Sequence, residues 1–286
     1  MGFLKERIWS WGYVLDKIPS AAPFTFEKTR CSLETQAAYI GAENLFYMNS
    51  MFNREYIETH FKTWDPEILT NCIDNRLSPA HMERLQGMKK VFCTLEHKNY
   101  LESALQIARL SLQYKNIAGI HMDDFGPGNG GPLLAQIHDK VKEINPDLKI
   151  AIVSYSHEDQ TIYKEAVKYV DMISRWRWVP SADYWRNHKE DIKLLRDLAG
   201  PEKTILQGIY IHDFGSSGLP VTECLSKVPM EVFQMSVETI CENTFNGTID
   251  GIIIPQAAYF SCRSHKNHVT FLKEYIDWFD ATTTKL

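Results

Sequence analysis

The chain alternates between short apolar runs and longer stretches in which hydrophobic residues recur every three to four positions. Alternating or wholly apolar short runs are typical of β-strands, and the longer spacing is typical of helices that bury one face. The pattern predicts eight strands, at residues 7–16, 44–49, 90–97, 117–122, 148–155, 172–178, 204–212 and 249–255. Helical stretches separate these strands along most of the chain, so the sequence predicts an α/β protein.

Unbroken alternation of eight strands with helices predicts a single (β/α)₈ TIM barrel that covers residues 1–286. A doubly wound sheet is the main alternative. It does not require eight units, and it does not explain why polar residues recur at the carboxyl ends of the predicted strands. Residues 50–77 form one long connection, which we expect to be an insertion or a lid.

Several helix boundaries carry their own signals. Ser32 is expected to cap a helix that stops at Gly41, and Ser78-Pro79 combines a capping residue with a proline in the first turn. Gly200 is expected to end another helix. Further helices are predicted at residues 101–112, 133–144, 163–169, 184–198, 230–242 and 269–279.

The stretch from Ile117 to Gly131 has the clearest chemical content. An apolar run ends in Asp123 and Asp124, and a glycine-rich turn then leads into a helix. A parallel strand delivers acids to the mouth of a barrel in this way. A second copy follows at residues 208–215, which matches residues 119–126 at five of eight positions, including the acid before Phe-Gly.

Strand residues in a barrel face alternately inward and toward the helices, and the helix-facing set should be aliphatic. Phasing the third, fourth and seventh strands on this rule gives an inward set of Phe92, Thr94, Glu96, Gly119, His121, Asp123, Gly208, Tyr210 and His212. Glu96, Asp123 and His212 are then expected in one layer at the mouth, with Asp124 and Asp213 just beyond the strand ends.

Acids surrounded by aromatic side chains suit a sugar substrate. Cleavage of a glycosidic bond needs one protonated and one ionised carboxyl group, and aromatic rings stack on pyranose faces. The candidate catalytic residues are Asp123, Asp124, Glu96 and Asp213. The candidate substrate-binding residues are Trp11, Asn49, Arg175, Trp176, Trp178, Tyr210, His212 and Gln256. Alternatively, Asp124 only caps a turn, Glu96 pairs with Arg175 or His97, and the tryptophans belong to the core.

In its architecture and in the acidic end of its fourth strand, the chain resembles the (β/α)₈ glycoside hydrolases and their relatives. The resemblance extends over nearly the whole chain and implies an essential acid at the end of strand four, where Asp123 or Asp124 stands. The chain departs from better-defined members of this group. It has no Asn-Glu pair on strand four, no Asp-x-x-Asp-x-Asp-x-Glu run and no acid on strand six.

Three other kinds of site have to be weighed. Glu96, His121, Asp123 and His212 could instead hold a metal ion in a barrel hydrolase or isomerase. A non-catalytic carbohydrate-binding barrel would need only the aromatic residues. Residues 126–131 formally satisfy Gly-x-Gly-x-x-Gly, but the preceding acids would repel a pyrophosphate, so we expect neither a dinucleotide nor any other cofactor.

Composition limits the partners. A formal net charge of −5 gives no electrostatic reason to expect nucleic acid, and a small molecule or an oligosaccharide is the expected partner. The six cysteines form no Cys-x-x-Cys pair. The sequence contains no apolar stretch long enough to span a bilayer and no signal-peptide pattern, as expected for a cytoplasmic protein or for a secreted one without its leader.

Overall fold

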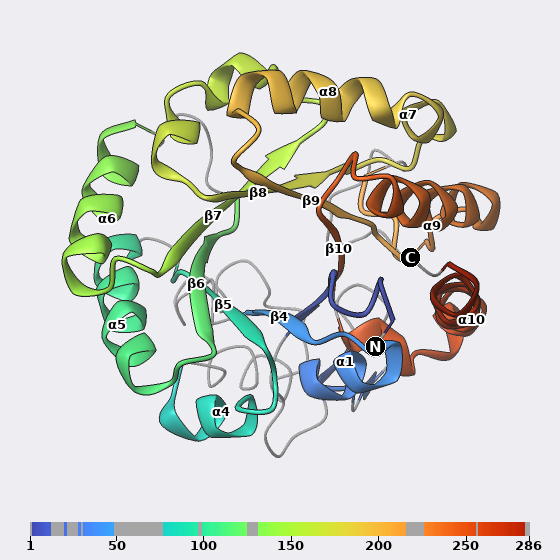
Figure 1. Ribbon diagram of the computed structural model, residues 1–286. Helices are drawn as coiled ribbons and strands as arrows, with labels where there is room; N and C mark the ends of the chain where they lie inside the picture. The colour runs from blue at the N-terminus through green and yellow to red at the C-terminus, as the bar shows by residue number, and fades with distance from the viewer. Residues whose placement is uncertain are drawn as a thin grey trace.

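The computed structural model describes residues 2–12, 20–21, 28–29, 31–48, 77–96, 99–124, 131–215, 226–255 and 257–283. Eight parallel strands form a closed barrel in the order β1-β10-β9-β8-β7-β6-β5-β4, because β1 pairs with both β10 and β4. The strands are β1 (Ile8–Gly12), β4 (Asn44–Tyr47), β5 (Lys90–Thr94), β6 (Ile117–Met122), β7 (Lys149–Tyr155), β8 (Met172–Trp176), β9 (Thr204–Gly208) and β10 (Gly251–Ile254). The predicted TIM barrel is therefore confirmed (Figure 1).

Helices surround the barrel as an outer ring (Figure 1). They are α1 (Leu33–Ile40), α4 (Pro79–Arg84), α5 (Tyr100–Gln113), α6 (Gly131–Ile144), α7 (Ala182–Arg186), α8 (His188–Ala199), α9 (Met230–Phe245) and α10 (Lys266–Thr282). Short 3-10 helices lie at Gln160–Tyr163, Ala166–Tyr169, Ala257–Ser261 and Arg263–His265, and β2 (Ser20–Ala21) pairs antiparallel with β3 (Lys28–Thr29). The long connection expected at residues 50–77 lies almost wholly outside the described residues.

The capping signals act as expected. The Ser32 hydroxyl accepts a hydrogen bond from the Thr35 amide, and Gly41 ends α1 in the left-handed conformation at φ 73°. Ser78 likewise caps α4, with Pro79 in its first turn. Two helix predictions differ from the structure. Residues 163–169, expected to be helical, contain parts of two 3-10 segments between β7 and β8, and the helix expected at residues 184–198 is divided between α7 and α8.

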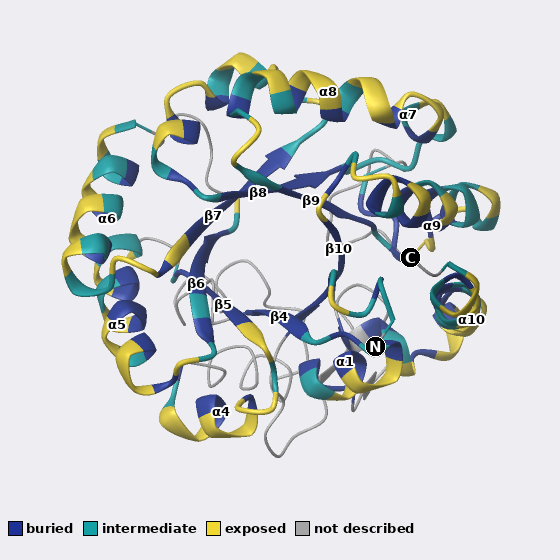
Figure 2. Cartoon of the chain, in the orientation of Figure 1, coloured by how far each residue is buried: buried dark blue, intermediate teal, exposed yellow. Residues whose placement is uncertain are grey.

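The two larger of three hydrophobic clusters in the described residues lie on opposite sides of the barrel wall, as an outer and an inner layer. The larger layer lies between strands and helices, where the strands are buried and the outer helix faces are exposed (Figure 2). The inner layer fills the barrel and consists of Trp9, Trp11, Phe46, Met48, Phe92, Ala151, Val153, Met172, Trp176, Leu206 and Ile253. The expected phase is confirmed for β5 and β6, because Val91, Cys93, Ile120 and Met122 belong to the outer layer.

Two glycines make room for the large rings inside the barrel. A Cβ atom at Gly119 would lie 2.3 Å from the Phe92 ring, and one at Gly208 would lie 2.1 Å from the Trp176 ring. Both distances are far below van der Waals contact, so the glycines are needed where these rings cross the neighbouring strands. The repeated Gly-Ile at the start of the two sequence copies therefore has a packing role.

Candidate functional site

The acid pair lies directly after the last residue of β6, at the carboxyl end of the barrel. Asp123 is partly buried and Asp124 is exposed. The amide of Asp124 donates a hydrogen bond of 3.1 Å to Oδ1 of Asp123. Among the described residues, Asp124 is the only non-glycine residue with a positive φ, at 47°. Such a conformation costs free energy and is found disproportionately at functional sites.

Burial raises the pKa of Asp123 well above its usual range, and the negative charge of Asp124 raises it further. The hydrogen bond from the Asp124 amide opposes these effects because it stabilises the ionised carboxylate. The balance favours a protonated Asp123 at pH values where an ordinary aspartic acid is ionised. The end of β6 thus holds a proton donor beside a second carboxyl group.

Three tyrosines surround the acid pair. The Tyr155 hydroxyl, at the end of β7, donates a hydrogen bond of 2.6 Å to Oδ1 of Asp124. Burial raises the pKa of Tyr155, Tyr210 and Tyr100, and the charges of Asp123 and Asp124 raise all three further. The phenols therefore remain neutral and can act as hydrogen-bond donors. Sequence reasoning selected Tyr210 but missed Tyr155, although Tyr155 shares the inward phase of Ala151 and Val153.

The predicted tryptophans divide into two groups. Trp178 is partly exposed and lies 6.1 Å from both Tyr155 and Tyr210, so its ring belongs to the mouth. Trp11 and Trp176 are 6% and 1% exposed and contact each other at 5.0 Å inside the barrel. These two rings form the floor beneath the mouth and are not available to stack on a sugar in this conformation.

Three buried polar atoms of residues inside the barrel have no hydrogen-bond partner among the described residues: Trp11 Nε1, Thr94 Oγ1 and His121 Nδ1. Burial lowers the pKa of His121 to about 3, so its ring is neutral. The Ser174 hydroxyl donates to the Ile152 carbonyl, which leaves it to accept from His121 Nε2 at 3.4 Å. His121 Nδ1 is then an acceptor. Buried polar atoms of this kind are normally satisfied by water or by a ligand group.

The remaining predicted acids lie in connections beyond their strands. Glu96 follows β5 and is partly exposed, and its amide donates to the Ser103 hydroxyl at 3.1 Å. Asp213 is buried, and its Oδ1 accepts a hydrogen bond of 3.0 Å from the Gly215 amide. The predicted strand 204–212 is too long, because β9 ends at Gly208.

The predicted place of His212 beside Asp123 and Glu96 needs correction. His212 stacks on Tyr259 with 5.0 Å between ring centroids, and its Nδ1 lies 3.1 Å from Nε2 of His265. Its described neighbours thus include Tyr259 and His265, from the segment after β10, and Phe214, with 5.0 Å between ring centroids. No group of three His, Cys, Asp or Glu side chains in the described part of the chain is arranged to hold a metal ion. The alternative metal site of Glu96, His121, Asp123 and His212 therefore has no geometric support there.

Arg175 was expected to bind substrate, but its side chain faces the helices. Its side chain is fully buried on the helix-facing side of β8, where its Nε donates to Asp191 Oδ2 at 2.9 Å and its Nη1 to the Tyr155 carbonyl at 2.8 Å. The guanidinium therefore joins β8 to α8 and β7 and does not reach the mouth. Asn49 and Gln256, two other predicted binding residues, lie outside the described residues.

No family model and no curated protein matches the sequence. Solved structures match its fold over most of both chains. They include an α-amylase from Geobacillus thermoleovorans complexed with acarbose, with a TM-score of 0.55, 7% identity and coverage of 98% of this chain and 80% of the other. A glycoside hydrolase family 5 mannosidase from Rhizomucor miehei, in complex with mannosyl-fructose, gives 0.53 and 11%, covering 86% of each chain.

Tryptophan synthase from Mycobacterium tuberculosis gives a TM-score of 0.53 at 8% identity, covering 97% of this chain and 92% of the other. Sequence identities this low establish the fold alone. The chain thus has the barrel of several enzyme classes, with glycoside hydrolases among them. In the described residues, no helix is long and apolar enough to cross a membrane.

Proposed function

We propose that the chain is a glycoside hydrolase that acts on a carbohydrate at the carboxyl end of the barrel. The observation that carries this proposal is the pair of adjacent carboxyl groups at the end of β6, where Asp124 accepts a hydrogen bond from Tyr155 and burial raises the pKa of Asp123. Glycosidic bond cleavage needs one protonated carboxyl group to release the leaving oxygen, and a second, ionised carboxylate to attack the sugar or to activate water. In this proposal the whole chain, residues 1–286, acts as one domain.

Asp123 takes the role of the general acid. The carboxylate of Asp124 is oriented by the Tyr155 hydroxyl and maintains the proton affinity of Asp123. Glu96, after the neighbouring strand β5, and Asp213, after β9, are the candidates for the second catalytic carboxylate if the reaction requires one further from the acid. An inverting mechanism needs about 6.5 to 9.5 Å between the two carboxyl groups, and a retaining one about 5 Å.

Trp178 and Tyr210 are the proposed contacts for the sugar ring. Trp178 is partly exposed beside the tyrosines, and its ring stacks on Phe214 with 5.7 Å between centroids. An aromatic ring that is held from behind can present its other face to the apolar face of a pyranose. An oligosaccharide or a small glycoside is therefore the proposed substrate, and no cofactor is part of the proposal.

Turnover of a panel of oligosaccharides and alkyl glycosides, whose leaving oxygens must be protonated, tests the proposal. The Asp123→Asn variant should lose about 10²- to 10⁴-fold in kcat, the usual contribution of a general acid, while it still binds the substrate. Asp183→Asn, which changes an exposed carboxylate on α7, is the matched control and should retain full activity. Parallel changes at Glu96 and Asp213 identify the second carboxylate.

Two outcomes would count against the hydrolase. Full activity of Asp123→Asn on a substrate that the unchanged protein hydrolyses would remove the acid from its role. Binding of a glycan without turnover, measured by calorimetry, would instead support a carbohydrate-binding barrel.

A further inference from the structure

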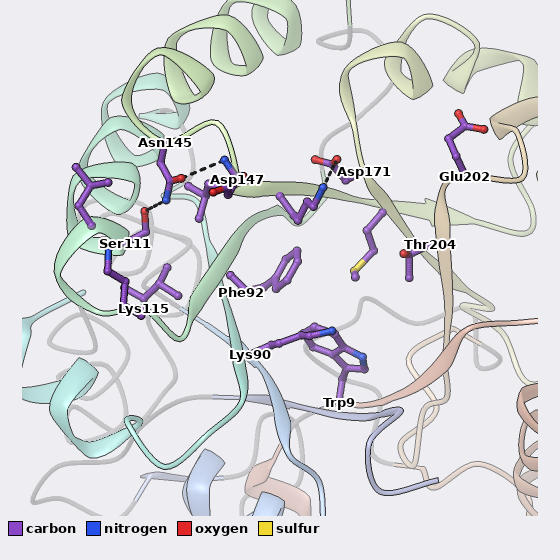
Figure 3. Close-up of a pocket in the computed structure, with 16 residues that line it drawn as sticks. Trp9, Lys90, Phe92, Ser111, Lys115, Asn145, Asp147, Asp171, Glu202 and Thr204 are labelled. Carbon is purple, nitrogen blue, oxygen red and sulfur yellow. Dashed lines mark hydrogen bonds and ion pairs between the residues drawn. The ribbon is translucent and has the colours of Figure 1, made fainter. Parts of the chain in front are cut away.

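A cavity of about 650 Å³ opens at the amino end of the barrel (Figure 3). Asp123 lies at the other end, directly after the last residue of β6. The first residues of five neighbouring strands line it together with Trp9 of β1. These five are Lys90 of β5, Ile117 of β6, Lys149 of β7, Met172 of β8 and Thr204 of β9. Its volume falls within the range of small-molecule binding sites.

The sequence keeps this end of the barrel open. Val91 pairs with Ile117 and Phe92 pairs with Gly119, so Ala118 is an extra residue that forms a β-bulge in the cavity wall. The inward-facing positions of β5 and β7 begin with Lys90 and Lys149. Because a lysine keeps its ammonium group in water, these residues do not close the barrel as branched apolar side chains would.

The floor of the cavity is aromatic and buried. The rings of Trp9 and Phe92 point toward the centre of the barrel (Figure 3) and meet edge to face, with 5.2 Å between their centroids. Met172 completes the floor, and Trp9 is only 4% exposed. In the described part of the chain, the indole N–H of Trp9 makes no hydrogen bond. The floor therefore combines an apolar surface with one unused donor.

The lysines at the rim of the cavity differ in whether they form ion pairs. Lys149 lies 3.2 Å from Asp171, and Lys142 lies 3.6 Å from the same carboxylate. Lys90 and Lys115 line the cavity and form no ion pair within the residues that the structure describes.

The other polar groups that line the cavity do not supply enough acceptors for the ammonium groups of Lys90 and Lys115. The Ser111 hydroxyl donates to the Ala108 carbonyl and accepts from Asn145 at 2.7 Å, so both of its roles are used. Glu202 lies 3.6 Å from Lys203, which leaves the exposed Asp147 as the remaining carboxylate of the lining. Two ammonium groups and one indole N–H thus lack an acceptor in the described residues. The complementary ligand supplies acceptor oxygens and a planar apolar part.

We propose that this cavity is a second ligand site, which binds a small organic oxyanion with a planar apolar body. The anionic group, a carboxylate or a phosphate ester, binds at the lysine-bearing rim, and the apolar body lies on Trp9, Phe92 and Met172. The site is independent of the proposed hydrolase, because it occupies the other end of the barrel.

Titration of the full chain with 2-naphthoate, 2-naphthyl phosphate and the neutral 2-naphthamide tests the proposal. Binding is followed in ¹⁵N NMR spectra through the indole N–H signals, with Trp9→Phe to assign the signal of Trp9. At least one anion should shift that signal, and the neutral amide should bind at least about fivefold more weakly. Preference for the carboxylate or for the phosphate ester distinguishes the two sources of the anion.

Lys90→Gln and Lys115→Gln should each weaken binding of the anion about three- to tenfold, the range for a partly exposed ionic hydrogen bond. Lys193→Gln removes an exposed lysine on α8 and should leave the affinity unchanged. Asp123→Asn should also leave it unchanged, which separates this site from the mouth. Equal binding of amide and anions, unchanged affinity in both lysine variants, or no shift of the Trp9 signal at millimolar anion would overturn the proposal.

Discussion

The Tyr155 hydroxyl donates a hydrogen bond of 2.6 Å to Oδ1 of Asp124, and so joins the carboxyl ends of β7 and β6. Asp124 accepts this bond while its backbone has a φ of 47°. The pair therefore holds a carboxylate in a backbone conformation that a side chain-bearing residue rarely adopts. Two expectations follow for variants at these positions.

Tyr155→Phe should lower kcat of the proposed reaction about tenfold or more, because a hydrogen bond to a charged group contributes about 1.5 to 3 kcal/mol. The fold should remain, since the ring itself is kept.

Asp124→Gly should remove the backbone strain and leave thermal stability equal or higher, while activity is lost. An Asp124→Gly protein that melts well below the unchanged protein would show that the conformation is not strained.

Asp123 should make the fold less stable as the pH rises. Its pKa in the folded protein lies above the unfolded value of about 3.9, so the folded state retains a proton that the unfolded chain releases. Stability is then lost from about pH 4 up to the raised pKa. Asp123→Asn should therefore stabilise the protein more at pH 7 than at pH 4.

Urea unfolding at several pH values measures this difference, with Asp183→Asn as the exposed control. Equal shifts in stability for both variants at pH 7 would contradict the proposed proton on Asp123.

His121, two residues earlier on β6, should have the opposite effect. Burial lowers its pKa from 6.5 to about 3, so the unfolded chain takes up a proton that the folded protein does not bind. Stability should fall as the pH decreases from about 6.5 toward 3, by about 1.4 kcal/mol per pH unit. His121→Gln lacks this titration and should reduce the slope of unfolding free energy against pH. If His121→Gln leaves the slope unchanged, His121 is not buried in its neutral form.

The ion pair of Arg175 with Asp191 should contribute to stability and not to the mouth. One partner is fully buried and the other is 16% exposed. Removing one member of such a pair leaves a buried charge alone and costs about 3 to 5 kcal/mol. Asp191→Asn should therefore shift the urea midpoint strongly, whereas Lys193→Gln, in an exposed pair, should cost less than about 1 kcal/mol. A loss of ligand affinity at the mouth in a folded Asp191→Asn protein would return Arg175 to the binding site.

The alternation of hydrophobic positions was sufficient to predict the barrel, because every strand must bury one face inward and one against the helices. The same alternation would also have predicted that Arg175 faces the helices. Since Ser174 and Trp176 face inward, the residue between them faces the helices, and its polarity alone suggested the mouth.

What the sequence did not reveal depends on where strands end and on contacts between distant segments. His212 would face the mouth if β9 continued, but the strand stops at Gly208 and His212 meets Tyr259 and His265. The bulge at Ala118, in the wall of the cavity at the amino end, is not indicated by hydrophobic spacing. The raised pKa of Asp123 depends on burial, which spacing along the chain indicates only indirectly.

Gly208 links the core of the barrel to the mouth, and a single added methyl group tests that link. A Cβ atom at this position would lie 2.1 to 2.3 Å from three atoms of the Trp176 ring. The ring cannot move freely, because it contacts Trp11 at 5.0 Å and its Nε1 donates to Ser174 at 3.1 Å. Gly208→Ala should therefore cost about 1 to 3 kcal/mol, the usual range for overpacking a core.

Trp176 also contacts Tyr210, with 5.0 Å between ring centroids, so displacement of the indole should reach the tyrosine beside the acid pair. We expect Gly208→Ala to weaken ligand binding at the mouth and to alter the near-ultraviolet circular dichroism of the aromatic residues. Gly87→Ala is the matched control, because a Cβ atom there meets nothing within 4 Å. If both alanine variants unfold at the same urea concentration and bind equally well, the Trp176 ring can shift without cost, and Gly208 is not needed for the packing beneath the mouth.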